Sequence, residues 1–293
     1  MRTEKAAVQA FYDRNGWRFD EGTGAFTDGA VFDDLRPATA DYRRRANERV
    51  RAALPPAGNL ILDAASGAIQ YDDYVRFSEG YRKRVCVDLS LLGLQAARRR
   101  IGAHGLFVRA DVTALPFASS AFDAVVSLHT IYHVPEEEQA TFLGEIGRVL
   151  CAGRRAVVVS TWTASPWDAV LRLPGALVRR TRKALGRRGS HRPVGPAAPT
   201  AAAPAAAPPR EAEGLYFHPT RRHWLRGAVS PPLSLRIRCW RSVGVPFLRS
   251  LDDGAGSRRL LRGLARIEDA WPVGTGLLGR YPLLVLDKRG DGG

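Results

Sequence analysis

The sequence contains little cysteine. Of its 293 residues only Cys86, Cys151 and Cys239 are cysteines, and no two of them form a Cys-x-x-Cys pair. A disulfide framework or a zinc site needs cysteines that are paired or clustered. The three cysteines stand among apolar neighbours, so we expect buried thiols in a reducing cytoplasm and predict no metal site.

Long apolar runs are also missing. No stretch approaches the roughly 20 apolar residues of a membrane-spanning helix. Residues 1–6 lack the apolar centre of a secretory signal. At the same time 45% of the residues are hydrophobic, which lets a chain of this length bury a substantial core. These features predict a cytoplasmic globular protein.

Acidic residues are absent from one long segment. Residues 169–210 contain nine arginines or lysines and no aspartate or glutamate, although the net charge of the whole chain is only +15. A nucleic-acid groove across the whole molecule is therefore not expected. Residues 167–188 fit a basic amphipathic helix, which could contact a membrane surface weakly, cover an anionic substrate, or simply be solvated. The Pro/Ala-rich residues 189–213 are expected to be disordered.

The apolar segments that are present are short and rich in valine and isoleucine, as strands buried on both faces are. They are 59–63, 84–88, 105–109, 122–128, 154–161, 233–241 and 281–288. The first three finish at or just before Asp63, Asp88 and Asp111, which are 25 and 23 residues apart. This spacing leaves room for one helix between strands and is typical of a parallel sheet. Carboxylates at the carboxyl ends of such strands face the ligand crevice, so a nucleoside-type cofactor site is predicted.

Helical patterns fill the N-terminus and the gaps between strands. We expect helices over 3–12, 39–54, about 90–101 with Ser90 as its cap, 135–153, 219–227 and 258–270. A loop is expected over 22–29. The pattern predicts four parts: an N-terminal helical cap (1–56), a cofactor-binding core (57–163), a basic insertion (164–232) and C-terminal strands that complete the sheet (233–293).

Several motifs carry a family resemblance. Residues 63–69 read Asp-Ala-Ala-Ser-Gly-Ala-Ile, and Val-Asp-Leu-Ser at 87–90, Ala-Asp-Val-Thr-Ala-Leu-Pro-Phe at 110–117 and the junction at 145–153 follow in order. In this order and spacing the chain resembles a class I S-adenosylmethionine-dependent methyltransferase of the small-molecule type. The family's first motif is Asp-x-Gly-x-Gly-x-Gly, of which only Gly67 is kept. The resemblance implies an α/β fold with a doubly wound, mostly parallel seven-stranded sheet, N-terminal helices and an insertion after the fifth strand.

The resemblance also implies S-adenosylmethionine as the cofactor. Asp88 would accept hydrogen bonds from both ribose hydroxyls, and Asp111 one from the adenine amino group, with Val112 against the ring. The expected cofactor-binding residues are Asp63, Ala64, Ala65, Ser66, Gly67, Asp88, Leu89, Asp111, Val112 and Leu128. Structural alternatives stay open: an ordinary strand-to-helix turn, a helix cap at Asp88 and a loop cap at Asp111.

His129 and His133, at the end of the fourth strand, are the candidate catalytic residues. Either could orient a substrate hydroxyl or take its proton, which contributes about 10²–10⁴ in rate. The alternatives are that His129 only lines the cofactor pocket and that His133 packs at a helix start. Residues 70–74 could touch the methionine end of the cofactor or the acceptor, and Arg36 could meet the methionine carboxylate.

The predicted function is methyl transfer from S-adenosylmethionine to an oxygen or nitrogen of a small molecule. Dehydrogenases share the strand–turn–acid layout, but residues 65–70 lack two glycines of their Gly-x-Gly-x-x-Gly fingerprint. Two alternatives remain, a non-catalytic binding module and a nucleic-acid methyltransferase that uses the basic insertion. Asp88 and Asp111 argue against the first, and the local confinement of charge argues against the second.

Overall fold

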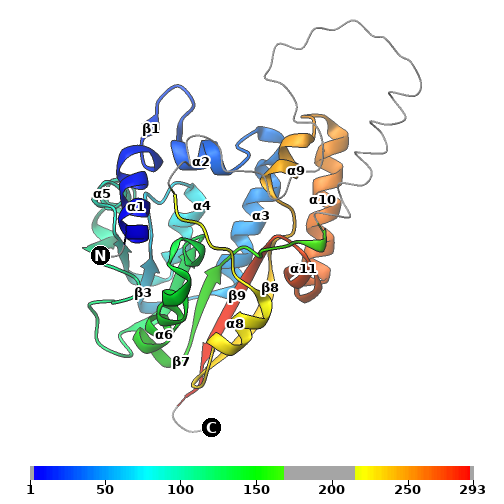
Figure 1. Cartoon of the computed structure of the whole chain (residues 1–293). Helices are drawn as coiled ribbons and strands as arrows, with labels where there is room; N and C mark the ends of the chain where they lie inside the picture. The colour runs from blue at the N-terminus through cyan, green and yellow to red at the C-terminus, as the bar shows by residue number, and fades with distance from the viewer. Residues whose placement is uncertain (1–2, 168–214, 291–293) are drawn as a thin grey trace, which may run out of the picture.

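The computed structural model describes residues 3–167 and 215–290. Its centre is a seven-stranded sheet with the order β5-β4-β3-β6-β7-β9-β8 (Figure 1). The strands are β3 Gly58–Ala64, β4 Tyr81–Asp88, β5 Gly105–Arg109, β6 Phe122–Leu128, β7 Leu150–Val159, β8 Leu233–Arg241 and β9 Tyr281–Lys288. The pairings among β3 to β7 are parallel, while β9 runs antiparallel to β7 and β8. The expected fold class is confirmed.

The strand order places the ligand crevice. The chain steps outward from β3 through β4 to β5 and then returns to pair β6 with the other side of β3. In open α/β sheets, ligands bind outside the carboxyl ends of the strands at such a switch point. The segments that follow β3, β4 and β6 therefore border a common site.

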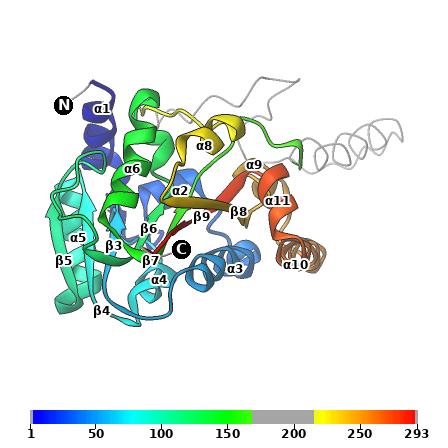
Figure 2. The same cartoon turned by 90° about the horizontal axis from the view of Figure 1, so that it is seen from below.

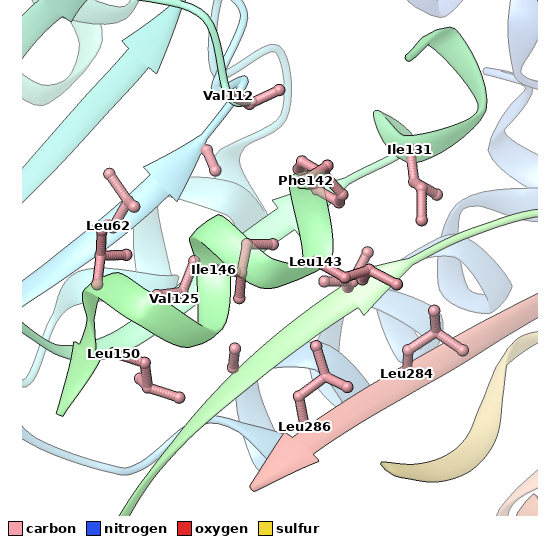
Figure 3. Packing of buried hydrophobic residues seen from close by; sticks show 14 of the residues in the cluster. Leu62, Val112, Val125, Ile131, Phe142, Leu143, Ile146, Leu150, Leu284 and Leu286 are labelled. Carbon is pink, nitrogen blue, oxygen red and sulfur yellow. The ribbon is translucent and has the colours of Figure 1, made fainter. Parts of the chain in front are cut away.

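Helices cover both faces of the sheet (Figure 2). They are α1 Thr3–Phe11, α2 Thr27–Phe32, α3 Pro37–Ala53, α4 Asp72–Val75, α5 Leu91–Ile101, α6 Gln139–Val149, α8 Arg222–Ala228, α9 Val245–Ser250, α10 Ala255–Ala270 and α11 Pro272–Leu278. On one face Phe142, Leu143 and Ile146 of α6 pack with strand residues such as Val125 and Leu284 (Figure 3). Apolar residues of α3, α4 and α5 form a second buried cluster with the opposite side of the strands.

Several helix boundaries differ from the sequence-based expectation. Ser90 does cap α5, since its Oγ accepts a hydrogen bond from the Gly93 N–H at 3.0 Å. The helix expected over 135–153 begins only at Gln139, after a 3₁₀ turn, and ends at Val149 because Leu150 is extended and pairs with Phe122. The expected loop at 22–29 contains one strand of a hairpin, β1 Phe19–Asp20 with β2 Ala25–Phe26, and the start of α2.

Some expectations concern the basic insertion. The predicted amphipathic helix at 167–188, apart from its first residue, and the predicted disorder at 189–213 lie outside the described residues. No helix in the described part of the chain is long and apolar enough to cross a membrane. Cys86 and Cys239 are buried as expected, whereas Cys151 is half-buried. The division into four parts stays a prediction.

Candidate functional site

A cavity of about 1630 Å³ lies at the carboxyl ends of the parallel strands. Ordinary small-molecule sites are roughly 300–1,000 Å³, so this cavity has room for two ligands side by side. The N-terminal segment, α9 and the ends of β8 and β9 supply the rest of its wall. Ten of the expected site residues line it: Asp63, Ala65, Ser66, Asp88, Leu89, Asp111, Val112, Leu128, His129 and His133.

The turn after β3 keeps a left-handed backbone with only one of the family's three glycines. The φ angles are +60° at Ala65, +54° at Gly67 and +54° at Ile69, the three positions where the motif has glycine. For a residue with a side chain this conformation costs roughly 1–2 kcal/mol. Two bonds hold the turn in place: Ser66 N–H donates to the Val87 carbonyl at 2.9 Å, and Gly67 N–H donates to Asp88 Oδ2 at 2.8 Å.

Ala64 and Gly67 are not among the residues that line the cavity, and their contact with the cofactor stays a prediction. Ala64 is fully buried in the core, and its carbonyl accepts a hydrogen bond from Ser127 Oγ at 2.7 Å. Gly67 lies beneath Trp17 of the N-terminal segment, whose ring atoms would be 2.3 Å from a Cβ at position 67. The missing side chain at this position therefore makes room for an indole of the chain itself.

The Asp63 carboxylate is already paired with a basic side chain of the neighbouring strand. Its Oδ2 accepts hydrogen bonds from Arg84 of β4, with Nε at 3.1 Å, and both side chains are buried. Burial raises the pKa of the Asp63 carboxyl, and the Arg84 guanidinium opposes that rise. Asp63 thus ties β3 to β4 directly before the turn. This ion pair supports the turn already in the absence of a ligand.

Asp88 is held by backbone donors on both of its oxygens. Oδ2 accepts from Gly67 N–H and Oδ1 from Ser90 N–H, each at 2.8 Å. Burial raises the pKa of Asp88 to about 6, although these two bonds oppose the rise. The carboxylate therefore joins the turn after β3 to the start of α5 and presents its remaining lone pairs to the cavity.

Asp111 bonds to its own loop and to the N-terminal helix. Oδ1 accepts from Thr113 N–H at 2.9 Å and from Thr113 Oγ1 at 2.8 Å, so the loop-capping alternative is present in the structure. Oδ2 accepts from the ammonium of Lys5 in α1 at 2.6 Å, and Lys5 also pairs with Glu138. Burial raises the pKa of Asp111, but the bonds from Lys5 and Thr113 outweigh that effect and leave it below its usual value.

His129 and His133 face the same cavity from the segment after β6. His129 has a φ of +60°, and its ring lies edge-on to Trp240 at 4.5 Å. Burial lowers the pKa of His129 to about 3 and that of His133 to about 4. His133 Nδ1 lies 2.8 Å from the Tyr216 carbonyl, which can only accept, so Nδ1 carries the proton and Nε2 is an acceptor. Both rings are neutral at neutral pH.

The far wall of the cavity contains a buried ion pair that the sequence analysis did not identify. Arg241, the last residue of β8, donates from Nη1 to Asp33 Oδ1 at 2.8 Å. The guanidinium stands against the rings of Trp240 and Tyr281, 4.8 and 5.0 Å from their centroids. The strand itself was predicted, but no local pattern marked its last residue as part of a site.

The remaining expectations have mixed outcomes. Gln70 lines the cavity and donates from Nε2 to Asp28 Oδ2 at 2.8 Å, and burial raises the pKa of Asp28 to about 6. Arg36 does not line it: its guanidinium bonds to Asp34 and to the Leu248 carbonyl, the latter at 2.8 Å. Among the described residues no group of three or more acidic, histidine or cysteine side chains could hold a metal ion.

Comparisons with known proteins identify a methyltransferase domain within the chain. Residues 62–158 match the family model described as a methyltransferase domain. A demethylmenaquinone methyltransferase of Thermus thermophilus is 38% identical over 121 residues, 40% of this chain and 53% of that protein. The ubiquinone/menaquinone biosynthesis C-methyltransferase UbiE of Hahella chejuensis is 33% identical over 109 residues, 35% and 43% of the two chains. The chain thus spans about half the length of the relatives it matches.

Solved structures of other proteins have the same fold as this chain. The geranyl diphosphate C-methyltransferase of Streptomyces coelicolor, in complex with S-adenosyl-L-homocysteine, superimposes with a TM-score of 0.55 at 13% identity, covering 98% of each chain. The cyclase SpnF gives 0.52 at 13% identity, covering 99% of this chain and 98% of that one. Identities this low show the fold alone. Residues 62–158 thus match a methyltransferase domain, and the seven-stranded sheet has the fold of class I S-adenosylmethionine-dependent methyltransferases.

Proposed function

We propose that this protein transfers a methyl group from S-adenosylmethionine to a small molecule. The observation that carries the proposal is the position of Asp88 and Asp111, which line one cavity at the carboxyl ends of neighbouring parallel strands. Asp88 keeps lone pairs for the two ribose hydroxyls, and the left-handed turn after β3 lies beside it. The cofactor supplies the electrophilic methyl group; the protein aligns it with the acceptor and excludes water.

The second part of the cavity supports an aromatic acceptor. It is lined by Tyr71, Tyr74, Tyr132, Trp240 and Tyr281, with the Arg241–Asp33 pair among them. Flat rings pack well on such side chains, and the guanidinium favours a partly negative oxygen on the acceptor. Burial raises the pKa of Tyr71 and of Tyr132 well above the usual value, so both hydroxyls stay protonated.

The two weakly basic histidines of the site favour one kind of acceptor atom over another. The sequence predicts oxygen or nitrogen as the acceptor atom, and the name of one relative, a C-methyltransferase, adds carbon. We favour a carbon of an oxygenated aromatic ring: the new C–C bond forms as the C–S bond of the cofactor breaks, and the ring proton then leaves from a strongly acidic cationic intermediate, for which a weak base is sufficient. His129 and His133, with pKa values of about 3 and 4, are poor bases for removing a proton from an oxygen or nitrogen acceptor. Their proposed role is to orient the acceptor as neutral hydrogen-bonding groups.

Calorimetry with S-adenosylhomocysteine tests the cofactor site. The wild-type protein is expected to bind it, and Asp88→Ala to bind about ten- to a hundredfold more weakly, because hydrogen bonds to a charged group contribute roughly 1.5–3 kcal/mol. Asp41→Ala, which removes an exposed carboxylate of α3, is the control and should bind as wild type. Equal binding by the wild type and Asp88→Ala would sink the assignment.

Transfer of labelled methyl to hydroxylated aromatic compounds tests the activity. Mass spectrometry of the product identifies the methylated atom, and an O- or N-methyl product would overturn the choice of carbon. Binding of S-adenosylhomocysteine without transfer to any metabolite fraction would favour the non-catalytic alternative. Transfer to RNA or DNA would favour the nucleic-acid alternative.

A further inference from the structure

The C-terminal helices α10 and α11 expose large apolar side chains. Leu260 is 49% exposed, Ile267 46% and Trp271, between the two helices, 52%. Both views place α10 and α11 at the β8 edge of the molecule, opposite the edge formed by β5 and α5 (Figures 1 and 2). Singly scattered apolar residues on a surface need no explanation, but these three are spaced as a group.

Helical geometry puts Leu260 and Ile267 on one line of α10. The two positions are seven residues apart, so with about 100° per residue they lie about 20° apart around the axis. Trp271 follows directly after the last residue of α10, and the three side chains are called the apolar line. The core-facing side of α10 is separate and consists of Leu261, Leu264, Ala265 and Glu268. The apolar line is therefore separate from the buried face of the helix. It stays exposed after α10 has packed against the rest of the protein.

Exposed arginines cover the other side of α10. Arg258, Arg259, Arg262 and Arg266 are all exposed, and none lies within 4.0 Å of an acidic side chain among the described residues. The acidic residues of the helix are already engaged: Glu268 by Arg49, and Asp269 by Arg45 and Arg49. Arg259 and Arg266 stand about 100–120° from the apolar line, at the border that an interfacial helix leaves for its cations.

We propose that α10 and the start of α11 dock on an anionic membrane surface. A line of Leu, Ile and Trp beside arginines is the arrangement of a helix that lies in a lipid interface, with the arginine stems extending to the headgroups. A second copy of the chain fits less well, because a two-fold contact on this face would bring the same unpaired arginines together. A polynucleotide could bind the arginines through its phosphates, but it would give the Leu260 and Ile267 side chains no apolar partner.

Sedimentation with phosphatidylcholine vesicles, with and without phosphatidylserine, tests the docking. The full-length wild type is expected to bind the phosphatidylserine vesicles. Two double variants, Ile267→Ser with Trp271→Ser and Arg259→Glu with Arg266→Glu, are each expected to lose at least about tenfold in partitioning. Arg98→Glu with Arg99→Glu, which reverses two exposed arginines of α5 at the opposite edge, is the matched control and should keep most of the binding.

Two further readouts make the result decisive. Each variant is checked for S-adenosylhomocysteine affinity, which should stay unchanged, so a failed cofactor assignment and a failed docking surface remain distinguishable. Because residues 169–210 are also basic, wild-type binding alone does not count as support. Vesicle binding as strong as that of the wild type in both α10 variants overturns the proposal, as does a dimer in sedimentation velocity that only the Ile267→Ser/Trp271→Ser variant abolishes.

Discussion

At the scale of single residues, the turn after β3 shows how a motif can change while its backbone stays. Ala65 and Ile69 adopt the left-handed conformation that glycine adopts freely. Ile69 is almost fully buried among apolar side chains, which compensates for its backbone strain. The sequence shows only the lost glycines, because the two bonds that hold the turn come from residues about 20 positions away along the chain.

Replacing Ala65 by glycine is expected to stabilise the protein. The change removes roughly 1–2 kcal/mol of left-handed strain. It adds back about 0.4–1 kcal/mol through the greater freedom of the unfolded chain. Urea unfolding should therefore show a net gain of up to about 1.6 kcal/mol. Ala64→Gly is the control: Ala64 is a fully buried strand residue, so this change should destabilise the protein. A loss of the same size in both variants contradicts the strain at Ala65.

Asp88 is expected to make cofactor binding depend on pH. Its pKa of about 6 lies above the ordinary 3.8, so in the free protein it favours folding below pH 3.8 and loses that contribution as pH rises through 6. Only the ionised form accepts from both ribose hydroxyls, so S-adenosylhomocysteine should bind more weakly as pH falls through 6. Calorimetry across pH 5–8 measures this.

Two variants separate Asp88 from its neighbour in the same cavity. Asp88→Asn cannot titrate and should bind weakly with no pH dependence near 6. Asp28 has a similarly raised pKa of about 6, so Asp28→Asn tests whether the wild-type dependence comes from that residue instead. The assignment to Asp88 fails if Asp28→Asn flattens the profile and Asp88→Asn does not.

At the scale of elements, the strands were easier to predict than the short helices. Five of the seven main strands lie within one residue of their expected bounds, since each is an apolar run between turn residues, while β4 and β7 begin three and four residues earlier than expected. The helices α9 and α11 were missed because six or seven residues give too few turns for a helical period. The start of α6 was misplaced because Pro135 opens a 3₁₀ turn before the α-helix begins.

Lys5 of α1 binds Asp111, and we expect the cofactor to enter faster when this lysine is replaced. The Lys5 ammonium occupies Oδ2 of Asp111, the carboxylate that the family resemblance assigns to the adenine amino group. Lys5→Met keeps the buried stem but removes this bond, so stopped-flow experiments should show faster association of S-adenosylhomocysteine. Arg14→Met removes an exposed cation of the same segment and should leave the rate unchanged. Slower association in Lys5→Met contradicts the prediction and means that the ammonium orients Asp111.

At the scale of the whole molecule, the site joins both ends of the chain. The carboxylates after β3, β4 and β5 could be predicted because each stands next to its own strand. Lys5, Asp33 and Arg241 could not, since only the folded chain brings these distant residues to one cavity. Local patterns in the sequence carry the cofactor half of the site, and the acceptor half depends on tertiary packing.

Breaking the Arg241–Asp33 pair is expected to destabilise the molecule strongly. Both side chains are buried, and loss of one partner from such a pair costs roughly 3–5 kcal/mol. Chemical unfolding of Arg241→Met should show this loss, and Arg241→Met with Asp33→Asn should recover part of it. Arg236, on the same strand as Arg241, forms an exposed ion pair with Asp287 of β9. Arg236→Met breaks this pair and should change stability by at most about 1 kcal/mol. Equal losses at positions 241 and 236 contradict the prediction.

The place of β9 in the sheet sets an order of events during synthesis. It is the last strand to be made, yet it lies between β7 and β8. On the ribosome β8 therefore has no neighbour to pair with until residues 281–288 have left the exit tunnel, and Arg241 at its end cannot yet be fixed in the cavity wall. The nascent chain can form the parallel half of the sheet first, and the acceptor side closes only after β9 has emerged.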